Sequence, residues 1–216
     1  MSVLKKRAEP KFHREQAAVR REALIESTLR CLKRHGHDGV SVRRISAEAG
    51  VSIGLINHHF PNKTALVADA YETLARSLRE SVQREADNAK ATPRQRLSGF
   101  FRASFSPPLV DPEIFNVWVV FWGMAAHEPE IQAVHERTYR EYRRVLESLL
   151  EGLMSSGAAP AFRLREAAIG LSALLDGLWV ELSLSHSAFR PAEAIALCED
   201  WVDALCAGAL RNLLRA

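Results

Sequence analysis

The sequence has few cysteines and no long apolar runs. Its 216 residues contain three cysteines, Cys31, Cys198 and Cys206, which are widely spaced and odd in number. This pattern argues against a disulfide framework and predicts a reducing environment. No apolar run approaches the ~20 residues of a membrane span, and the N-terminus lacks the apolar core of a signal peptide. We therefore expect a cytoplasmic protein that does not enter a membrane.

Motifs of known catalytic and metal sites are also missing. The chain has no H-E-x-x-H, no Gly-rich phosphate loop and no G-x-S-x-G. His127-Glu128 and His135 offer an acid–base pair, but closeness in sequence alone is weak support for one. Cys31, His35 and His37 are also close, yet no second cluster completes four metal ligands. We predict that the protein is not an enzyme and has no catalytic residues, no metal and no cofactor.

Positive charge is concentrated at the N-terminal end. Residues 1–63 contain thirteen Lys/Arg and six Asp/Glu, a net charge of +7, whereas the remainder carries −4. This asymmetry suggests that a polyanion meets the N-terminal segment, although a basic arm without a partner would have the same composition. We expect a flexible basic arm over residues 1–14, a DNA-binding domain over 15–63, and an effector-binding and dimerisation domain over 64–216.

Residues 40–63, V-S-V-R-R-I-S-A-E-A-G-V-S-I-G-L-I-N-H-H-F-P-N-K, predict two short helices joined by a tight turn. Ser41 and Ser52 are typical N-cap residues for helices over about 42–49 and 53–59. Gly50 permits a left-handed turn between the helices, and Pro61 ends the second one. Two helices with this connection are typical of a helix-turn-helix.

The second of these helices would present a small, polar face to a DNA groove. We expect Ile53, Ile56 and Phe60 to be buried on the opposite face. A helical hairpin in an ordinary all-α protein is the alternative. The DNA-binding residues that we expect are Ser41, Arg43, Arg44, Ser52, Gly54, Asn57, His58 and Lys63.

The same stretch resembles the DNA-binding segment of the TetR family of bacterial transcriptional regulators, which reads much like I-A-x-x-A-G-V-S-x-G-x-x-Y-x-H-F-x-x-K. The chain departs from this pattern at Asn57, where the family often has a tyrosine that contacts a phosphate. The residues in register are Ile45, Ser46, Ala49, Gly50, Val51, Ser52, Gly54, His59, Phe60 and Lys63. The resemblance implies a repressor that binds an operator in double-stranded DNA.

Helical patterns fill the rest of the chain, and no stretch predicts a strand, so we expect an all-α fold of about nine helices. The last two helices, about 164–186 and 191–214, carry more apolar surface than one chain covers, which predicts a homodimer. A two-fold dimer places two reading helices ~34 Å apart, matching a palindromic operator. A monomer whose own core covers both helices is the alternative. The remaining helices are expected over 15–35, 63–88, 93–105, 112–127 and 129–154.

Tryptophans near carboxylates mark a candidate effector site. Trp118 and Trp122 lie at i and i+4 and so share a helix face, and Trp179 has Asp176 and Glu181 close in sequence. Aromatic faces beside a carboxylate suit an organic cation without N–H donors, whose strong attractions are cation–π contact and charge. Tryptophans that simply fill a core would show the same spacing.

The segments W-V-V-F-W-G-M-A-A-H-E-P and A-L-L-D-G-L-W-V-E-L-S-L-S are similar to the BetI-type branch of the TetR family. That resemblance implies a repressor of glycine betaine synthesis genes that responds to choline or a related quaternary ammonium compound. A TetR-type repressor for an unrelated hydrophobic or cationic compound, such as a drug or metabolite, remains an alternative. So does a helical adaptor without regulatory function, which would need neither a recognition helix nor a deep aromatic pocket.

Overall fold

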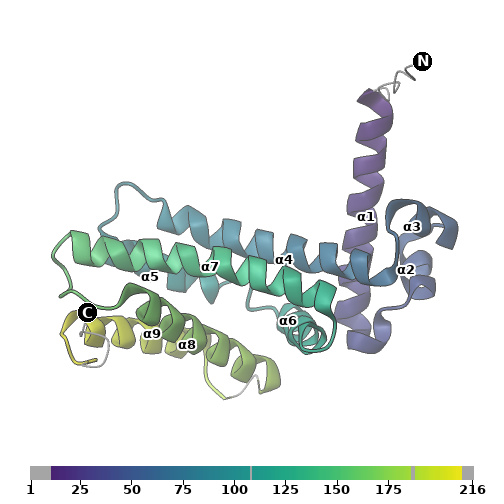
Figure 1. The fold of residues 1–216 in the computed structure, drawn as a ribbon. Helices are drawn as coiled ribbons and strands as arrows, with labels where there is room; N and C mark the ends of the chain where they lie inside the picture. Colours follow the sequence, from purple (N-terminus) through teal and green to yellow (C-terminus); the bar gives the residue numbers. More distant parts are fainter. Residues whose placement is uncertain (1–10, 108, 186–187, 211–216) are drawn as a thin grey trace. The chain divides into compact units, whose positions relative to one another are not determined.

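The structure is a computed structural model that describes residues 11–107, 109–185 and 188–210. These residues form nine α-helices and one short 3₁₀ helix and contain no strand, which confirms the all-α class (Figure 1). The elements are α1 (Lys11–His35), η1 (Gly36–Gly39), α2 (Val42–Ala49), α3 (Ile53–His59), α4 (Lys63–Ala86), α5 (Pro93–Ser104), α6 (Pro112–Ala125), α7 (Pro129–Ser155), α8 (Leu164–Leu184) and α9 (Pro191–Cys206).

The chain divides into two compact units, residues 1–70 and residues 71–216. The division falls inside α4, so the first two turns of this helix belong to unit 1 and the remainder to unit 2. Unit 1 contains α1, α2 and α3, with α2 packed against α1. Unit 2 contains α5 to α9, with α7 packed against α5, α6 and α8, and α9 packed against α5 and α8.

The first helix begins earlier than the sequence predicts. It starts at Lys11 rather than at Glu15, so the last four residues of the expected basic arm are helical. Residues 1–10, the rest of that arm, lie outside the described residues. Lysine and arginine are good helix formers, so a basic composition does not by itself prevent a helix from extending.

The last helix ends earlier than predicted, at Cys206 rather than Leu214. Gly208 has a φ of 72°. Its N–H donates to the carbonyl of Leu205 (3.1 Å), and the N–H of Ala209 donates to the carbonyl of Ala204 (2.9 Å). This is the Schellman arrangement, in which a left-handed glycine closes a helix. Ala209 therefore follows the helix, and Leu213 lies outside the described residues.

Helix α8 corrects the expectation that the chain has no apolar run long enough to span a membrane. It has 21 residues and is, by length and composition, apolar enough to cross a membrane. Half of its most apolar stretch of 18 residues is buried within the protein, however, as in the core helix of a globular unit. Gly170 brings it close to α9, because a β-carbon there would lie 3.4 Å from the ring of Trp201.

Candidate DNA-binding helix and effector pocket

The two short helices of unit 1 are bounded by side-chain caps. The Ser41 hydroxyl oxygen accepts a hydrogen bond from the N–H of Arg44 (3.3 Å), and that of Ser52 accepts one from the N–H of Leu55 (3.2 Å). These bonds satisfy backbone donors that a helix leaves unpaired at its N-terminus. Both caps and the bounds of both helices are as predicted from the sequence.

Gly50 makes the turn between α2 and α3. Its φ of 65° lies in the left-handed region, which glycine adopts without the steric cost of a β-carbon. Beside it, the N–H of Val51 donates to the carbonyl of Ser46 (3.1 Å), and the Ser46 hydroxyl donates to the carbonyl of Val51 (2.5 Å). This reciprocal pair fixes the direction in which the chain enters α3.

Helix α2 is held to α1 by a shared carboxylate. Glu48 accepts a hydrogen bond from Arg30 (2.8 Å) and another from Arg34 (2.9 Å). The bond from Arg30 holds the pKa of Glu48 below its ordinary value. Charge-assisted bonds of this kind are short and directional, so they set the position of α2 as well as its attachment.

The C-terminal end of α3 is held by Arg21 of α1. Its guanidinium donates to the carbonyl of His59 (3.0 Å) and lies 4.3 Å from the centre of the Phe60 ring. It also forms an ion pair with Asp69 in the first part of α4. One arginine therefore ties three helices of unit 1 together and keeps the buried Phe60 in place.

Most of the expected DNA-binding side chains are exposed. Ile56 and Phe60 are each 1% exposed and hold the inner face of α3, as predicted. The prediction that Ile53 is buried is wrong, because 42% of it is exposed. Ile53 opens the helix one turn before Ile56, and helical periodicity does not show where the supporting core ends. Arg43, Arg44, Ser52, Gly54, Asn57 and His58 are exposed, and Ser41 and Lys63 are half-buried.

Among the described residues of unit 1, no packing contact requires a glycine at position 54. Gly54 has no left-handed backbone, and an added β-carbon would meet only the Ser52 hydroxyl, at 3.8 Å. Glycine inside a helix costs about 1 kcal/mol relative to alanine. A backbone without a side chain at this exposed point of α3 favours close approach by another molecule.

Lys63 is the first residue of α4. Asn62 caps this helix, since its side-chain oxygen accepts a hydrogen bond from the N–H of Ala65 (2.7 Å). The unpaired N–H groups and the dipole of a helix N-terminus favour anions. The lysine therefore lies where a phosphate would be attracted both by its own charge and by the helix.

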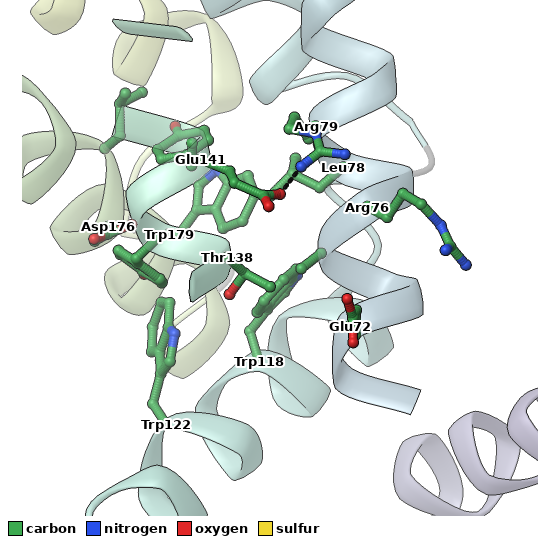
Figure 2. A pocket seen from close by; sticks show the side chains of 14 residues that line it. Glu72, Arg76, Leu78, Arg79, Trp118, Trp122, Thr138, Glu141, Asp176 and Trp179 are labelled. Atoms are coloured by element: carbon green, nitrogen blue, oxygen red, sulfur yellow. Dashed lines mark ion pairs between the residues drawn. The ribbon is translucent and has the colours of Figure 1, made fainter. Parts of the chain in front are cut away.

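Unit 2 contains a cavity of about 220 Å³ between α4, α6, α7 and α8 (Figure 2). Its wall includes Trp118, Trp122, Trp179 and Asp176, so the structure brings together four of the five expected effector residues. Drug-sized ligands occupy pockets of ~300–1,000 Å³. The cavity therefore favours a small ligand.

The three indoles present ring surface to the cavity rather than N–H groups. The centre of the Trp118 ring lies 6.4 Å from that of Trp122 and 6.2 Å from that of Trp179. All three Nε1 atoms are buried, and those of Trp118 and Trp179 have no hydrogen-bond partner among the described residues. The faces of such rings attract a cation through the ring quadrupole.

Most charges on the wall are paired. Arg79 of α4 forms an ion pair with Glu141 of α7, drawn as a dashed line in Figure 2. Glu72 accepts a hydrogen bond from Arg137 at 2.7 Å. These two pairs link α4 to α7 and leave little net charge on that side of the cavity.

Asp176 is the wall carboxylate without a counter-ion. No lysine or arginine of the described residues lies within ion-pair distance of it, and Arg76 points away from the indoles (Figure 2). Burial raises the pKa of Asp176 to about 6, against the opposing effects of a hydrogen bond from Tyr139 and the charge of Arg143. A cation in the cavity would stabilise the ionised carboxylate.

Glu181, the alternative carboxylate, does not reach the cavity. It is exposed, and it is absent from the cavity wall. It lies five positions after Asp176, which at about 100° per residue places the two side chains on faces of α8 about 140° apart. Closeness in sequence therefore did not indicate a shared site, because helical spacing already separates these two side chains.

The contribution of α4 and α7 to the cavity was not predicted from the sequence. The charged residues from Arg137 to Arg144 are typical of the outer face of a helix, yet Thr138, Tyr139 and Tyr142 between them line the cavity. Burial raises the pKa of both tyrosine hydroxyls, so they stay protonated as hydrogen-bond donors. A signal was present in the helical period that runs through Ile131, Val134, Thr138, Tyr142 and Val145.

The rejected chemical candidates show no assembled site. The Nδ1 atom of His135 lies 2.7 Å from the hydroxyl of Tyr71, and His127 is exposed. In the part of the chain that the structure describes, no group of three or more His, Cys, Asp or Glu side chains is placed to hold a metal ion. Cys31 of α1 is buried, and burial raises the pKa of its thiol.

Comparison with known families assigns both units. Residues 24–70 match the family described as bacterial regulatory proteins of the tetR family. Residues 93–207 match the family described as BetI-type transcriptional repressor, C-terminal. The chain is 31% identical to the HTH-type transcriptional regulator BetI of Burkholderia thailandensis over 88% of this chain and 94% of that protein. The corresponding protein of Paraburkholderia phymatum is 32% identical over the same shares.

Solved structures show the same fold. A crystallised protein from Pseudomonas aeruginosa PAO1, described as a transcriptional regulator, is 46% identical with a TM-score of 0.85, and the match covers 96% of this chain and all of that one. A regulator from Saccharomonospora viridis in complex with choline has a TM-score of 0.73 at 22% identity, over 86% of this chain and 96% of that one. At that identity the likeness concerns the fold alone.

A capped helix-turn-helix in one unit and an aromatic cavity in an all-α second unit define the class of helix-turn-helix transcriptional repressors. The sequence matches then narrow the class. The chain belongs to the TetR family of bacterial transcriptional regulators and carries a BetI-type C-terminal domain, as the sequence motifs predicted.

Proposed function

We propose that the protein is a cytoplasmic, dimeric repressor that releases its operator when a small quaternary ammonium compound enters the cavity of unit 2. Choline is the leading candidate, and genes that convert choline to glycine betaine are the leading targets. The observation that carries this proposal is a cavity walled by three indoles, with the carboxylate of Asp176, which forms no ion pair among the described residues, beside them. Relatives named BetI, and the choline complex of a protein with this fold, support the same class of effector.

On the DNA side, α3 would lie in the major groove. Ser52, Asn57 and His58 are exposed together on it, and the amide of Asn57 is suited to adenine. Gly54 would let the backbone approach closely, while Lys63 would contact a phosphate. Ser41, Arg43 and Arg44 at the start of α2 would add contacts to the same DNA backbone.

Two copies would associate through α8 and α9. Leu184 of α8 is 73% exposed and Leu197 of α9 is 49% exposed. Ala173 is also exposed and shares the face of α8 that carries Leu184. Apolar side chains beside small ones let helices pack closely, so we propose a four-helix contact formed by α8 and α9 of both copies.

The coupling between cavity and operator would run through α4. This one helix carries Lys63 at its start and Glu72, Leu78 and Arg79 on the cavity wall. A ligand shifts a conformational equilibrium only if it binds one conformer more tightly than the other. A pivot of α4 that improves contact with the bound cation would change the spacing of the two recognition helices and weaken operator binding.

The apolar part of the wall favours a second candidate, a repressor of the same type for another hydrophobic or cationic compound. Leu78 and Leu175 line the cavity along with the indoles. Calorimetry with choline and with 3,3-dimethylbutanol, its neutral carbon analogue, separates the two. The quaternary ammonium proposal requires choline to bind more tightly and Trp179→Ala to weaken it. Equal binding of both compounds would favour the hydrophobic effector instead.

A further inference from the structure

A second, wider hollow lies next to the cavity in unit 2. Its volume is about 560 Å³, and it is lined by the end of α6, the first half of α7 and part of α8. Trp122, Tyr139 and Asp176 line both spaces. The outer hollow and the inner cavity are therefore separated by a wall of shared side chains, two aromatic and one acidic.

Among the described residues, those that line the outer hollow include carboxylates but no arginine or lysine. Its charged lining residues are Asp176 and Glu136, whereas the inner cavity is lined by the arginines Arg76 and Arg79 together with three carboxylates, Glu72, Glu141 and Asp176. Glu136 is exposed, and its carboxylate accepts a hydrogen bond from the side-chain amide of Gln132 (3.2 Å). An amide leaves the charge of the carboxylate in place, so the hollow is the more attractive of the two spaces to an approaching cation.

Of the described residues that line the outer hollow, His135 alone is basic, and its imidazole is kept neutral. His135 lies 2.7 Å from the Tyr71 hydroxyl through Nδ1, and burial lowers the pKa of its imidazole. Its ring centre is 4.3 Å from that of Tyr139. Together with Trp122 these rings give the hollow an aromatic lining, so its chemistry repeats that of the inner cavity.

We infer that the outer hollow is a vestibule that collects small organic cations and passes them between Trp122 and Tyr139 into the inner cavity. This inference rests on the proposed function, because it supplies the route by which the effector reaches its site. Glu136 draws the cation in through charge, and Trp122 offers it an aromatic face. Asp176 borders both spaces, so the cation keeps a carboxylate beside it throughout its passage.

A vestibule affects rates in a way that a binding site does not. Ala126 lines the outer hollow but not the inner cavity, and it is exposed at the end of α6. A tryptophan there narrows the route without touching the bound ligand. Ala126→Trp is expected to slow choline association and dissociation by the same factor, about tenfold, and to leave Kd unchanged within about twofold. Ala133→Trp, an exposed position of α7 that lines neither space, is the matched control.

Charge on the vestibule is tested separately. Stopped-flow tryptophan fluorescence gives both rate constants for choline. Glu136→Gln is expected to slow association about threefold at low salt and to leave dissociation unchanged, because it removes steering but no contact in the inner cavity. Added salt should reduce the difference. Glu151→Gln, which removes an exposed charge farther along the same helix, should have no such effect.

The outcomes separate the vestibule from the effector proposal. Unchanged rates in Ala126→Trp, or a changed Kd without parallel changes in both rates, would overturn the vestibule. If choline still binds at equilibrium in that case and Trp179→Ala still weakens it, the effector proposal stands. If the wild-type protein does not bind choline at equilibrium, both proposals fall.

Discussion

The helix-turn-helix of unit 1 and the cavity of unit 2 are built on different length scales. In unit 1 the caps, the turn and the inner face of α3 come from residues 41–60, each within a few positions of its partner. In unit 2 the wall of one cavity comes from four helices between Glu72 and Trp179. A site that meets a partner at the surface is specified locally, whereas an enclosed site requires the whole unit to pack.

The largest effect that we predict is on dimerisation, where substitutions in unit 2 change operator binding by unit 1. Leu184→Arg combined with Leu197→Arg places charge on the apolar face of α8 and α9, so sedimentation should show monomers. Operator affinity should then fall more than about a hundredfold, because one half-site is lost. Val119→Arg, at an exposed apolar position of α6, serves as the control. A wild-type protein that sediments as a monomer at micromolar concentration would refute the dimer.

Gly54→Ala separates folding from DNA binding within unit 1. Alanine should stabilise the helix by up to about 1 kcal/mol, while its methyl group weakens operator binding about tenfold, or about 1.4 kcal/mol. Gly123→Ala is matched to it, since Gly123 is also an exposed helical glycine with open space around it. Gly123→Ala should raise the melting temperature without affecting operator binding. Fluorescence anisotropy of a labelled operator and thermal denaturation together decide the question, and normal binding by Gly54→Ala would remove the close-approach role.

Asp176→Asn tests the cavity of unit 2. The substitution keeps the size of the side chain but removes its charge, so calorimetry should show choline affinity lowered about tenfold. Operator binding without choline should be unchanged. Glu181→Gln is the control, because Glu181 lies outside the cavity. Equal effects of the two substitutions would show that general charge, rather than Asp176, governs binding.

Choline affinity should depend on pH through Asp176. Burial raises the pKa of this carboxyl to about 6, with Tyr139 and Arg143 opposing the shift. A bound cation favours the ionised form, so it lowers that pKa and binding releases a proton below pH 6. Affinity should therefore be greatest above pH 6 and fall about tenfold from pH 7 to pH 5 as the ionised fraction falls. A flat profile in the wild type would contradict this pH dependence. The same profile in Asp176→Asn would show that another group causes it.

The smallest effect concerns Lys63. Lys63→Ala should weaken binding to all DNA sequences alike by a few-fold and lower the slope of log affinity against log salt concentration by about 1. Titrations of operator and unrelated DNA at several salt concentrations measure both quantities. Normal binding at every salt concentration would show that Lys63 does not contact a phosphate.

The local features of unit 1 could be predicted because single residues determine them. A serine cap and a left-handed glycine act within one turn, so the bounds of α2 and α3 follow from Ser41, Gly50 and Ser52. The same logic failed at Ile53, because its exposure depends on how far the surrounding core extends. It also failed at the end of α9, where the Schellman motif at Gly208 was present in the sequence and overlooked.

The cavity could be predicted only in part. The identities of Trp118, Trp122, Trp179 and Asp176 suggested a cation site, and the fold places all four on one wall. The tyrosines of α7 were missed because the arginines around them favour an outer face. The pairing of Arg79 with Glu141 depends on the packing of α4 against α7, which no local pattern encodes.

Reversal of operator binding by choline tests the central claim most directly. Genomic fragments that include the region upstream of the gene would be selected with the protein, and the selected fragment then titrated with and without ligand. We expect specific retardation of that fragment, reversed by choline at micromolar to millimolar concentration and not by 3,3-dimethylbutanol at the same concentration. Retardation that choline leaves unchanged, or that both compounds reverse equally, would contradict a repressor controlled by a quaternary ammonium effector.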